Sequence, residues 1–284
     1  MVKKLFITDF DGTLLTDTKN IHPQDIKTLQ CLKKNNIVTA IATGRSLYSF
    51  MKALKAIDMA QDSNHLPVDY IIFSTGAGIL EVKTNQVIFQ KAIPSSKIKI
   101  VTSYLDDQLF DYMVHAANPD TRYLLYRSHG QDNPDFYRRI SMYKAYAEPL
   151  ADDYQHQGPA TQVLAILPGK MGFEKVERVQ RQLTGFSVIH ATSPLDHTSV
   201  WIEIFHKDVS KSRTADYLAQ KLDIEPADVI SVGNDYNDQD LLDWSGIGFM
   251  VENGPETLKQ KFEVVPSNNQ CGVTQAAEAA GLLG

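Results

Sequence analysis

The chain has 284 residues, of which 43% are hydrophobic and 22% charged, so it can fold as one large domain or two modest ones. Its net charge of −6 at pH 7 disfavours a nucleic-acid partner, and no apolar run approaches the ~20 residues that span a bilayer, so we expect no membrane partner. Cys31 and Cys271 show neither disulfide nor zinc spacing, and the first residues do not resemble a signal peptide, so we expect a cytoplasmic protein.

Short apolar runs alternate with segments of helical period at the start of the chain. Leu5–Ile7, Ile37–Ala42 and Tyr70–Phe73 are predicted strands, because each is a short apolar run rich in branched or aromatic residues. A helix is expected from Pro23 onward, and Leu47–Leu54 repeats apolar side chains at i, i+3, i+4 and i+7. This alternation predicts parallel strands joined by crossover helices.

The same pattern returns late in the chain, where Val229–Val232 and Ile247–Val251 are further predicted strands. We therefore expect a doubly wound α/β core with a mostly parallel, Rossmann-like sheet, built from residues 1–80 and 199–284.

The middle of the chain, residues 81–198, has a different pattern, with longer and more alternating strands. The predicted strands are Gln86–Ala92, Arg122–Arg127, Thr161–Leu167 and Phe186–Ala191, and the predicted helices are Ser96–Leu105 and Phe173–Leu183. These elements favour a mixed, largely antiparallel sheet with helices on one face. We interpret residues 81–198 as an α+β domain inserted into the core.

The first candidate site directly follows the first predicted strand. Asp9 and Asp11 are separated by one residue and are followed by Gly12 and Thr13. Ligands of open α/β sheets bind at the carboxyl ends of the strands, which is where this segment lies. Paired carboxylates there can bind Mg²⁺ and divide the roles of nucleophile and acid/base, while Gly12 permits a tight turn that brings backbone N–H groups to an anion. The alternative is an ordinary acidic turn.

The second candidate site, Thr43, Gly44 and Arg45, lies between the second predicted strand and its helix. A hydroxyl and free N–H groups at a helix N-terminus form an anion site. Thr43 can also be a simple N-cap. Arg45 can reach a substrate or lie on the helix surface, and the sequence does not separate these roles.

Two further candidates lie in the last third of the chain. Lys211 begins a predicted helix, where a lysine is ordinarily a surface residue, but a pocket with several acids needs a compensating cation. Asn234, Asp235, Asn237 and Asp238 follow the strand Val229–Val232. An Asx-rich turn is the structural alternative for this second group.

Taken together, these motifs resemble the haloacid dehalogenase-like (HAD) phosphatases, and more narrowly the Cof-type branch with a large inserted α/β (C2-type) cap. The resemblance covers nearly the whole chain, although the cap matches by position and pattern only. It implies that Thr43, aided by the Gly44 amide, holds the transferring phosphate and that Lys211 neutralises charge. It also implies that Mg²⁺ is bound by Asp9, the Asp11 backbone carbonyl and the fourth motif.

The fourth motif departs from the usual family pattern, Gly-Asp-x-x-Asn-Asp. Asn237 and Asp238 match its last two positions, but Asn234 stands where the metal-binding aspartate is expected and Asp235 follows it. Asn234 can still bind through its carbonyl oxygen, or Asp235 can turn in as at least an outer carboxylate. The sequence leaves the direct metal ligand open.

The expected activity is hydrolysis of a small phosphate ester, with sugar phosphates as the family's usual substrates and Mg²⁺ as the cofactor. Asp9 attacks phosphorus and forms an aspartyl-phosphate, and Asp11 protonates the leaving alcohol and then activates water. We expect the inserted domain to select the substrate. Three alternatives are a phosphomutase of the same superfamily, a receiver-type phospho-acceptor and, because of Asn234, a catalytically weak binding protein.

Overall fold

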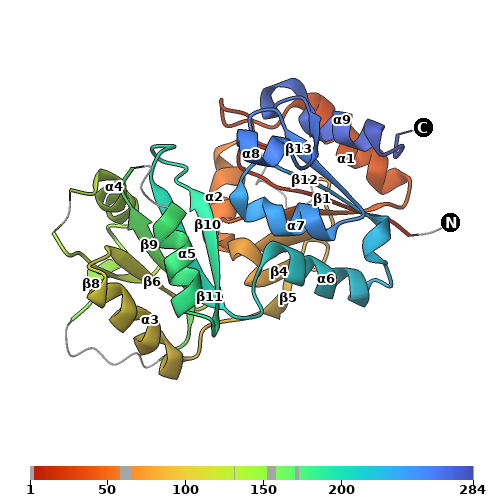
Figure 1. Cartoon of the computed structure of the whole chain (residues 1–284). Helices are drawn as coiled ribbons and strands as arrows, with labels where there is room; N and C mark the ends of the chain where they lie inside the picture. Colours follow the sequence, from red (N-terminus) through yellow and green to blue (C-terminus); the bar gives the residue numbers. More distant parts are fainter. Residues whose placement is uncertain (1–2, 58–65, 131, 152–157, 170–172, 284) are drawn as a thin grey trace. The chain divides into compact units, whose positions relative to one another are not determined.

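The structure is a computed structural model that describes residues 3–57, 66–130, 132–151, 158–169 and 173–283 (Figure 1). The chain divides into two compact units. The first contains Met1–Arg45, Ser49–Phe89 and Ser210–Gly284, and the second contains Ser46–Tyr48 and Gln90–Val209. The long second segment is therefore inserted between two parts of the first unit. It begins and ends later in the chain than the 81–198 that we expected.

The first unit is built on an eight-stranded sheet with the order β14-β13-β12-β1-β2-β3-β4-β5. The strands are β1 Leu5–Thr8, β2 Val38–Ala42, β3 Tyr70–Phe73, β4 Gly78–Glu81, β5 Gln86–Gln90, β12 Val229–Gly233, β13 Ile247–Val251 and β14 Glu263–Val265. From β14 to β3 every pair is parallel, and β4 then runs antiparallel to β3. In the register of the sheet, Leu5 of β1 lies opposite Val38 of β2 and Val229 of β12.

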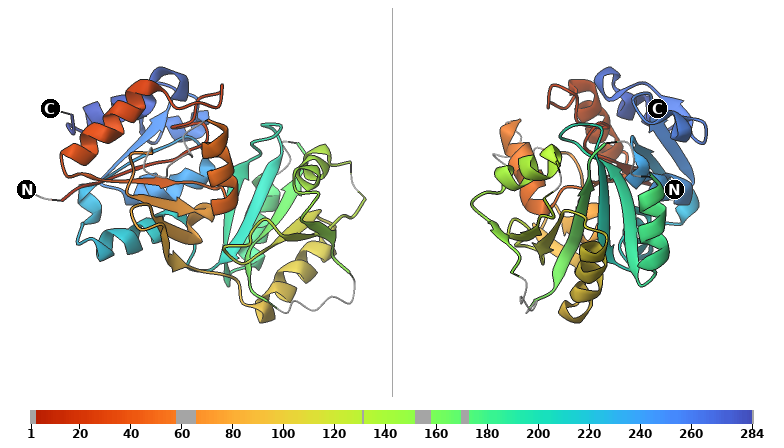
Figure 2. Two further views of the ribbon diagram at one scale, coloured as in Figure 1. Left: turned by 180° about the vertical axis from the view of Figure 1, so that it is seen from behind. Right: turned by 60° about the vertical axis from the view of Figure 1, so that its left-hand side comes forward.

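Helices cover both faces of this sheet. They are α1 Pro23–Lys34, α2 Leu47–Ala56, α6 Lys211–Lys221, α7 Gln239–Trp244, α8 Glu256–Lys259 and α9 Gly272–Ala279, with short 3₁₀ turns at η1 Ser74–Gly76, η2 Pro226–Asp228, η3 Tyr236–Asp238 and η4 Asn268–Gln270. On one face, Leu218 of α6 and Leu241 of α7 pack with Ile7 of β1. On the other, α1 packs against α9, and both lie across the sheet from α6 and α7 (Figure 2). The predicted doubly wound, mostly parallel core is confirmed.

The second unit is a six-stranded sheet with the order β10-β11-β9-β6-β7-β8. Its elements are α3 Ser95–Asp107, β6 Tyr112–Ala116, β7 Leu124–Arg127, α4 Pro134–Met142, β8 Ala147–Pro149, β9 Ala160–Leu167, α5 Phe173–Gln182, β10 Phe186–Thr192 and β11 Val200–His206. All of its pairs are antiparallel except β7 with β8. Val101 of α3 and Val179 of α5 belong to one core cluster with Val163 of β9.

Two details of this unit differ from the sequence prediction. Helix α4 was not predicted, and its Phe136 packs with Leu164 on the face of the sheet opposite α3 and α5, so helices do not cover one face alone. The run 86–92 was predicted as a strand of the inserted domain, but β5 lies beside β4 at the edge of the core sheet. A half-buried edge strand has the same alternating pattern in either sheet, so the sequence does not show which sheet it joins.

In the described part of the chain, no helix is both long and apolar enough to cross a membrane.

Candidate active site

The candidate residues of the first unit gather where neighbouring parallel strands end. Asp9 follows β1, Thr43 follows β2 and Asn234 follows β12. The Asp9 N–H donates to Val232 O at 2.8 Å, so Asp9 is held beside the end of β12. Because β1 lies between β2 and β12 in register, the three segments emerge side by side at one edge of the sheet.

Lys211 lies between two carboxylates at the bottom of this site. Its Nζ is 2.7 Å from Asp9 Oδ1 and 2.5 Å from Asp238 Oδ1, and its side chain has no exposed surface. It opens α6, where Ser210 caps the helix by accepting the Arg213 N–H. The sequence led us to expect Lys211 near the phosphate. In the structure its ammonium group contacts the Asp9 carboxylate directly.

Burial and charge set the protonation of this cluster. Burial, together with the charge of Asp238, raises the pKa of Asp9 to about 7, although Lys211 acts in the opposite direction. Burial alone would lower the pKa of Lys211, but the carboxylates of Asp238 and Asp9 outweigh it and raise that pKa. Lys211 therefore remains a cation, and it offsets the repulsion between two carboxylates that would otherwise face each other in a dry site.

Asp238 and Asp235 shape the loop after β12. Asp238 Oδ2 accepts the backbone N–H groups of Asn234 at 2.9 Å and of Asp235 at 3.1 Å. The Asp235 side chain in turn accepts the Asp238 N–H, which completes a capping box at the start of η3. A Cβ on Gly233 would lie 2.5 Å from Asp238 Cβ, so this close approach requires glycine. This contact of Asp235 is of the kind that an Asx-rich turn makes, which was the structural alternative for this group.

Asp11 is held by Arg45. The guanidinium makes two hydrogen bonds, Nε to Oδ2 at 2.6 Å and one terminal nitrogen to Oδ1 at 2.7 Å, and both side chains are partly exposed. The same guanidinium lies 5.7 Å from the centre of the Phe10 ring. The Arg45 N–H donates to Thr43 Oγ1 at 3.1 Å, which ties this pair to the second motif. Arg45 is thus not a simple surface residue.

Thr43, Gly44 and Asn237 share one side of the site. Thr43 is fully buried, and a Cβ built on Gly44 would lie 3.5 Å from Asn237 Nδ2 and 3.6 Å from Thr75 Oγ1. The Thr75 N–H donates to Thr43 O at 3.0 Å. Ser74 and Thr75 both adopt left-handed backbone conformations, with φ of 49° and 54°, which non-glycine residues rarely do. Such strain is characteristic of functional loops.

The Asn234 side chain completes the arrangement. The end of its amide lies 2.9 Å from Asp11 O, 3.2 Å from Asp9 Oδ2 and 3.2 Å from Thr13 Oγ1. Gly12, with φ of +77°, makes this possible, because a Cβ there would lie 2.5 Å from Asn234 Nδ2. Asn234 is the residue at which the sequence departs from the family pattern. Its side chain therefore lies at the point where Asp9, the Asp11 carbonyl and the Thr13 hydroxyl come together.

This point suits a hard metal ion that binds oxygen. Among the described residues, no three histidine, cysteine, aspartate or glutamate side chains converge on a metal site, so any site must also use backbone and amide oxygens. Asp9 Oδ2, Asp11 O and Asn234 Oδ1 can supply them. Mg²⁺ takes six oxygens at about 2.1 Å and right angles, which places neighbouring ligands roughly 3 Å apart. The separations of 2.9 and 3.2 Å around the Asn234 amide match that spacing.

A network of asparagines that the sequence analysis largely missed supports the first motif from behind. Asn253, in the loop after β13, donates from Nδ2 to Gly12 O at 2.8 Å and accepts the Asn268 N–H at 3.0 Å. Asn268 donates to Leu15 O at 3.0 Å and to Asp17 Oδ1 at 3.1 Å. Spacing along the chain does not reveal these contacts, because they join segments that are far apart in the sequence.

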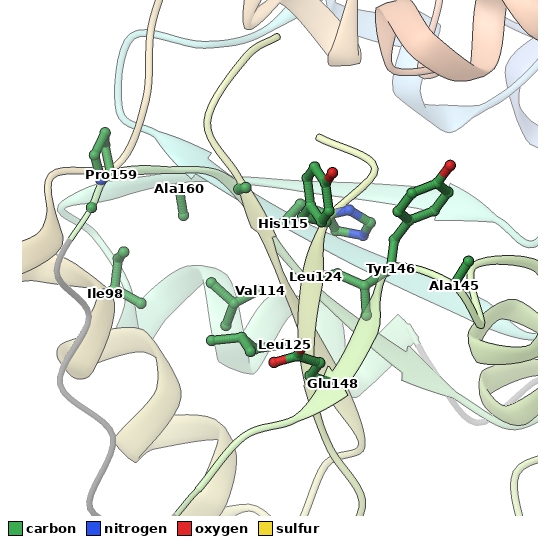
Figure 3. Close-up of a pocket in the computed structure, with 13 residues that line it drawn as sticks. Ile98, Val114, His115, Leu124, Leu125, Ala145, Tyr146, Glu148, Pro159 and Ala160 are labelled. Carbon is green, nitrogen blue, oxygen red and sulfur yellow. The ribbon is translucent and has the colours of Figure 1, made fainter. Parts of the chain in front are cut away.

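The second unit contains a pocket of its own, with a volume of about 330 Å³ (Figure 3). Its walls come from α3, β6, β7, β8 with the residues just before it, and the start of β9. They include apolar side chains such as Ile98 and Val114 beside Tyr146 and Glu148. His115 also lines it, and its buried Nε2 has no hydrogen-bond partner among the described residues. The pocket is thus an amphipathic cavity within the inserted unit.

Comparison with known proteins decides the family. The sequence model of the haloacid dehalogenase-like hydrolases matches residues 6–276. The chain belongs to the haloacid dehalogenase-like hydrolase family. The resemblance to HAD phosphatases that the motifs suggested is therefore confirmed.

Similar HAD proteins come from several bacteria. A Bacillus subtilis protein named "Putative phosphatase YxeH" is 25% identical over 281 residues, which cover 96% of each chain. Among solved structures, the HAD phosphatase BT1666 of Bacteroides thetaiotaomicron has a TM-score of 0.76 at 19% identity and covers 99% of this chain and 96% of that one. The HAD subclass IIB sugar phosphatase BT4131 has the same TM-score at 16% identity, over 99% and 100% of the two chains. These structural likenesses establish the fold.

Proposed function

We propose that this HAD phosphatase hydrolyses a small phosphate ester, of the sugar-phosphate class, in two steps through a phosphorylated Asp9. One observation carries the proposal: Lys211 is buried on Asp9 Oδ1, while Asp9 Oδ2 lies 3.2 Å from the end of the Asn234 amide. A carboxylate that is half neutralised in this way can be approached by a phosphate dianion, which an isolated carboxylate would repel.

In the first step an oxygen of Asp9 forms a bond to phosphorus, and the bond from phosphorus to the ester oxygen breaks. Asp11 gives its proton to the departing alkoxide, so that an alcohol leaves. In the second step water attacks phosphorus, Asp11 takes the proton of that water, and the Asp9 carboxylate is restored as inorganic phosphate leaves. Because Arg45 donates hydrogen bonds to both carboxylate oxygens of Asp11, this pair must loosen when Asp11 exchanges a proton with the substrate oxygen.

The remaining site residues bind the phosphoryl group. We assign the transferring phosphate to the Thr43 hydroxyl, the N–H groups of Gly12, Thr13 and Gly44, and the Asn237 amide. Their support is positional, since Asn237 Nδ2 lies beside Gly44 and both motifs end at the same edge of the sheet. Asp238 acts through Lys211 and through the loop that it holds.

We propose Mg²⁺ as the cofactor. Asp9, the Asp11 carbonyl and Asn234 would hold it directly, and Asp235 would not be a direct ligand. When bound, it supplies positive charge to the phosphoryl oxygens. The oxygen spacing described above supports this assignment. The neutral Asn234 is also the observation that keeps a second candidate function, a binding protein with weak turnover.

Substrate choice is assigned to the inserted unit. Its pocket offers aromatic faces and a carboxylate, which suit a hydroxylated ring. Exchanging residues 90–209 for the corresponding segment of a relative with a different substrate should transfer the preference. An unchanged preference would rule out this assignment.

The decisive experiment measures phosphate release from a panel of sugar, nucleotide and vitamin phosphates, with Mg²⁺ and with chelator. The wild type should show metal-dependent turnover, and Asp9→Asn should lower it by more than about a thousandfold. Transfer of phosphate between positions of a sugar, with no free phosphate, would favour a phosphomutase. Ligand binding without measurable turnover would favour the binding protein.

A further inference from the structure

The Asn234 amide lies where the proposed metal ligands converge, and its two ends are chemically different. In one orientation Nδ2 donates to Asp11 O at 2.9 Å and to Asp9 Oδ2 at 3.2 Å. In the orientation related by a half-turn, Oδ1 occupies that position and accepts from Thr13 Oγ1 at 3.2 Å. It then faces the same two oxygens, which have no hydrogen to offer it.

Each orientation therefore suits a different state of the site. Three acceptor oxygens that face one another are unfavourable unless a cation lies among them. Without a cation, the orientation with Nδ2 inward directs its two hydrogens to Asp11 O and Asp9 Oδ2, so neither of these oxygens is left without a donor. With a cation, only the orientation with Oδ1 inward adds a ligand. The geometry of the surrounding atoms is nearly the same for both, because nitrogen and oxygen of an amide occupy similar positions.

Glycine at position 12 accommodates the outer end of the Asn234 amide. This end of the amide faces Gly12, where even one added carbon would approach to 2.5 Å. The backbone of Asn234 is meanwhile fixed, since its N–H donates to Asp238 Oδ2 at 2.9 Å. Rotation about the last side-chain bond is thus the motion that this arrangement allows.

We propose, on the basis of the function proposed above, that Asn234 is an amide switch that a metal ion turns. In the metal-free enzyme its NH₂ group bridges Asp9 and the Asp11 carbonyl, and on Mg²⁺ binding the amide turns and its carbonyl oxygen becomes a ligand. The site is closed by hydrogen bonds when empty, so metal must displace them to enter.

The switch also changes the charge of the site. Lys211 is shared by Asp9 and Asp238, so these three groups together carry one negative charge, and Asp11 is balanced by Arg45. Of these carboxylates, Asp9 is the one with an oxygen, Oδ2, beside the end of the Asn234 amide, so it presents this negative charge to the metal. An aspartate at position 234 would add a second negative charge. This charge would strengthen Mg²⁺ binding, and without Mg²⁺ it would repel Asp9. The asparagine therefore lowers the affinity for Mg²⁺ and stabilises the site when no metal is bound.

Asp235 is the competing ligand, and the structure argues against it. Its side chain accepts the Asp238 N–H in the capping box, which directs it toward the start of η3. The proposal accordingly gives Asp235 no part in metal affinity.

The first test titrates Mg²⁺ into the full-length wild type, Asn234→Asp and Asp235→Asn, by calorimetry and by thermal unfolding at constant ionic strength. Asn234→Asp should bind Mg²⁺ at least about tenfold more tightly and unfold at a lower temperature without metal, because it gains a charged ligand. Asp235→Asn should bind within about twofold of the wild type. Unchanged or weaker binding by Asn234→Asp, or lost binding by Asp235→Asn, would overturn the proposal.

A second test observes the switch in the wild type, and it does not depend on the variants folding. The side-chain NH₂ signals of Asn234, assigned in ¹⁵N spectra by their loss in Asn234→Asp, should report a hydrogen-bonded amide without metal and shift on addition of Mg²⁺. Signals that stay in place while calorimetry records binding would overturn the switch alone. A wild type that binds no Mg²⁺ would overturn both the switch and the metal in the proposed function, whereas turnover abolished by Asp9→Asn would still support the nucleophile.

Discussion

Lys211 donates a 2.7 Å hydrogen bond to Asp9 from a position with no exposed surface. The same ammonium group serves Asp238, so one cation is shared by two buried carboxylates. A buried charge without its partner is costly, so this cluster links the stability of the fold to the chemistry of the site.

Replacement of Lys211 by methionine should therefore remove both activity and stability. The change leaves Asp9 and Asp238 facing each other without a cation, and we expect a loss of about 3–5 kcal/mol in the free energy of unfolding. Urea unfolding at pH 7.5 without metal would measure it. The matched variant is Lys211→Met with Asp238→Asn, which removes one carboxylate and should recover part of the loss. A double variant no more stable than Lys211→Met would show that packing, and not charge, determines the loss.

The elements that the sequence predicted are those whose local pattern and tertiary role agree. Helix α1 begins at Pro23 as expected, because a proline in the first turn costs no hydrogen bond and His22 caps the helix by accepting the Gln24 N–H. Helix α4 was missed although Asn133 and Pro134 form a cap and first-turn signal, because Phe136 is the only apolar side chain that it fully buries. The helix has only nine residues, and the two apolar side chains that it directs to the core, Phe136 and Ile140, are too few to define a helical period by themselves.

The site residues divide in the same way, into contacts that the sequence predicted and contacts that it did not. Asp9, Thr43 and Asn234 could be placed together because each follows a parallel strand, and the strand order brings those ends to one edge. Lys211 was placed by its position in the motif order. The two hydrogen bonds between Arg45 and Asp11, and the support of Gly12 by Asn253, depend on side-chain directions that spacing along the chain does not encode.

Asn253 should act as a positioning residue for the first motif. Its Nδ2 holds Gly12 O at 2.8 Å, so Asn253→Ala should let the Gly12–Thr13 turn shift and should lower kcat/KM by about tenfold. The free energy of unfolding should fall by about 1–3 kcal/mol, because the variant loses two hydrogen bonds, one to Gly12 O and one from the Asn268 N–H. Asn269→Ala is the control, because Asn269 contacts Asp17 at the surface of the same network. Equal losses of kcat/KM in the two variants would count against a specific role for Asn253.

His115 should make the second unit sensitive to acid. Burial, and next the charge of Arg139, lower the pKa of His115 from 6.5 to about 3. Between these two values the unfolded chain takes up a proton that the folded chain does not. Stability is therefore retained above pH 6.5 and lost as pH falls toward 3, by about 1.4 kcal/mol per pH unit.

The measurement is urea unfolding of the wild type and His115→Asn from pH 7 to pH 4, followed by a probe in the second unit such as Trp201 fluorescence. Asparagine can keep the hydrogen bond that His115 Nδ1 makes to Thr121 O at 2.9 Å, but it does not titrate. The variant should be less dependent on pH over this range, whatever its stability at pH 7. An identical pH dependence in both proteins would show that other groups cause the acid sensitivity.

Gly12 offers a test of whether the first motif and Asn234 depend on each other. Gly12→Ala places a side chain at a φ of +77°, which costs about 1–2 kcal/mol by itself, and brings the new carbon to 2.5 Å from Asn234 Nδ2. Gly130→Ala is a matched control, since Gly130 has a φ of +75° and no atom within 4 Å of its added carbon. Both variants should lose stability without metal, but only Gly12→Ala should lose the rise in melting temperature that Mg²⁺ produces, because only there is Asn234 displaced. If the rise survives in Gly12→Ala, the Asn234 side chain is not needed for metal binding, and the oxygens of Asp9 and Asp11 suffice.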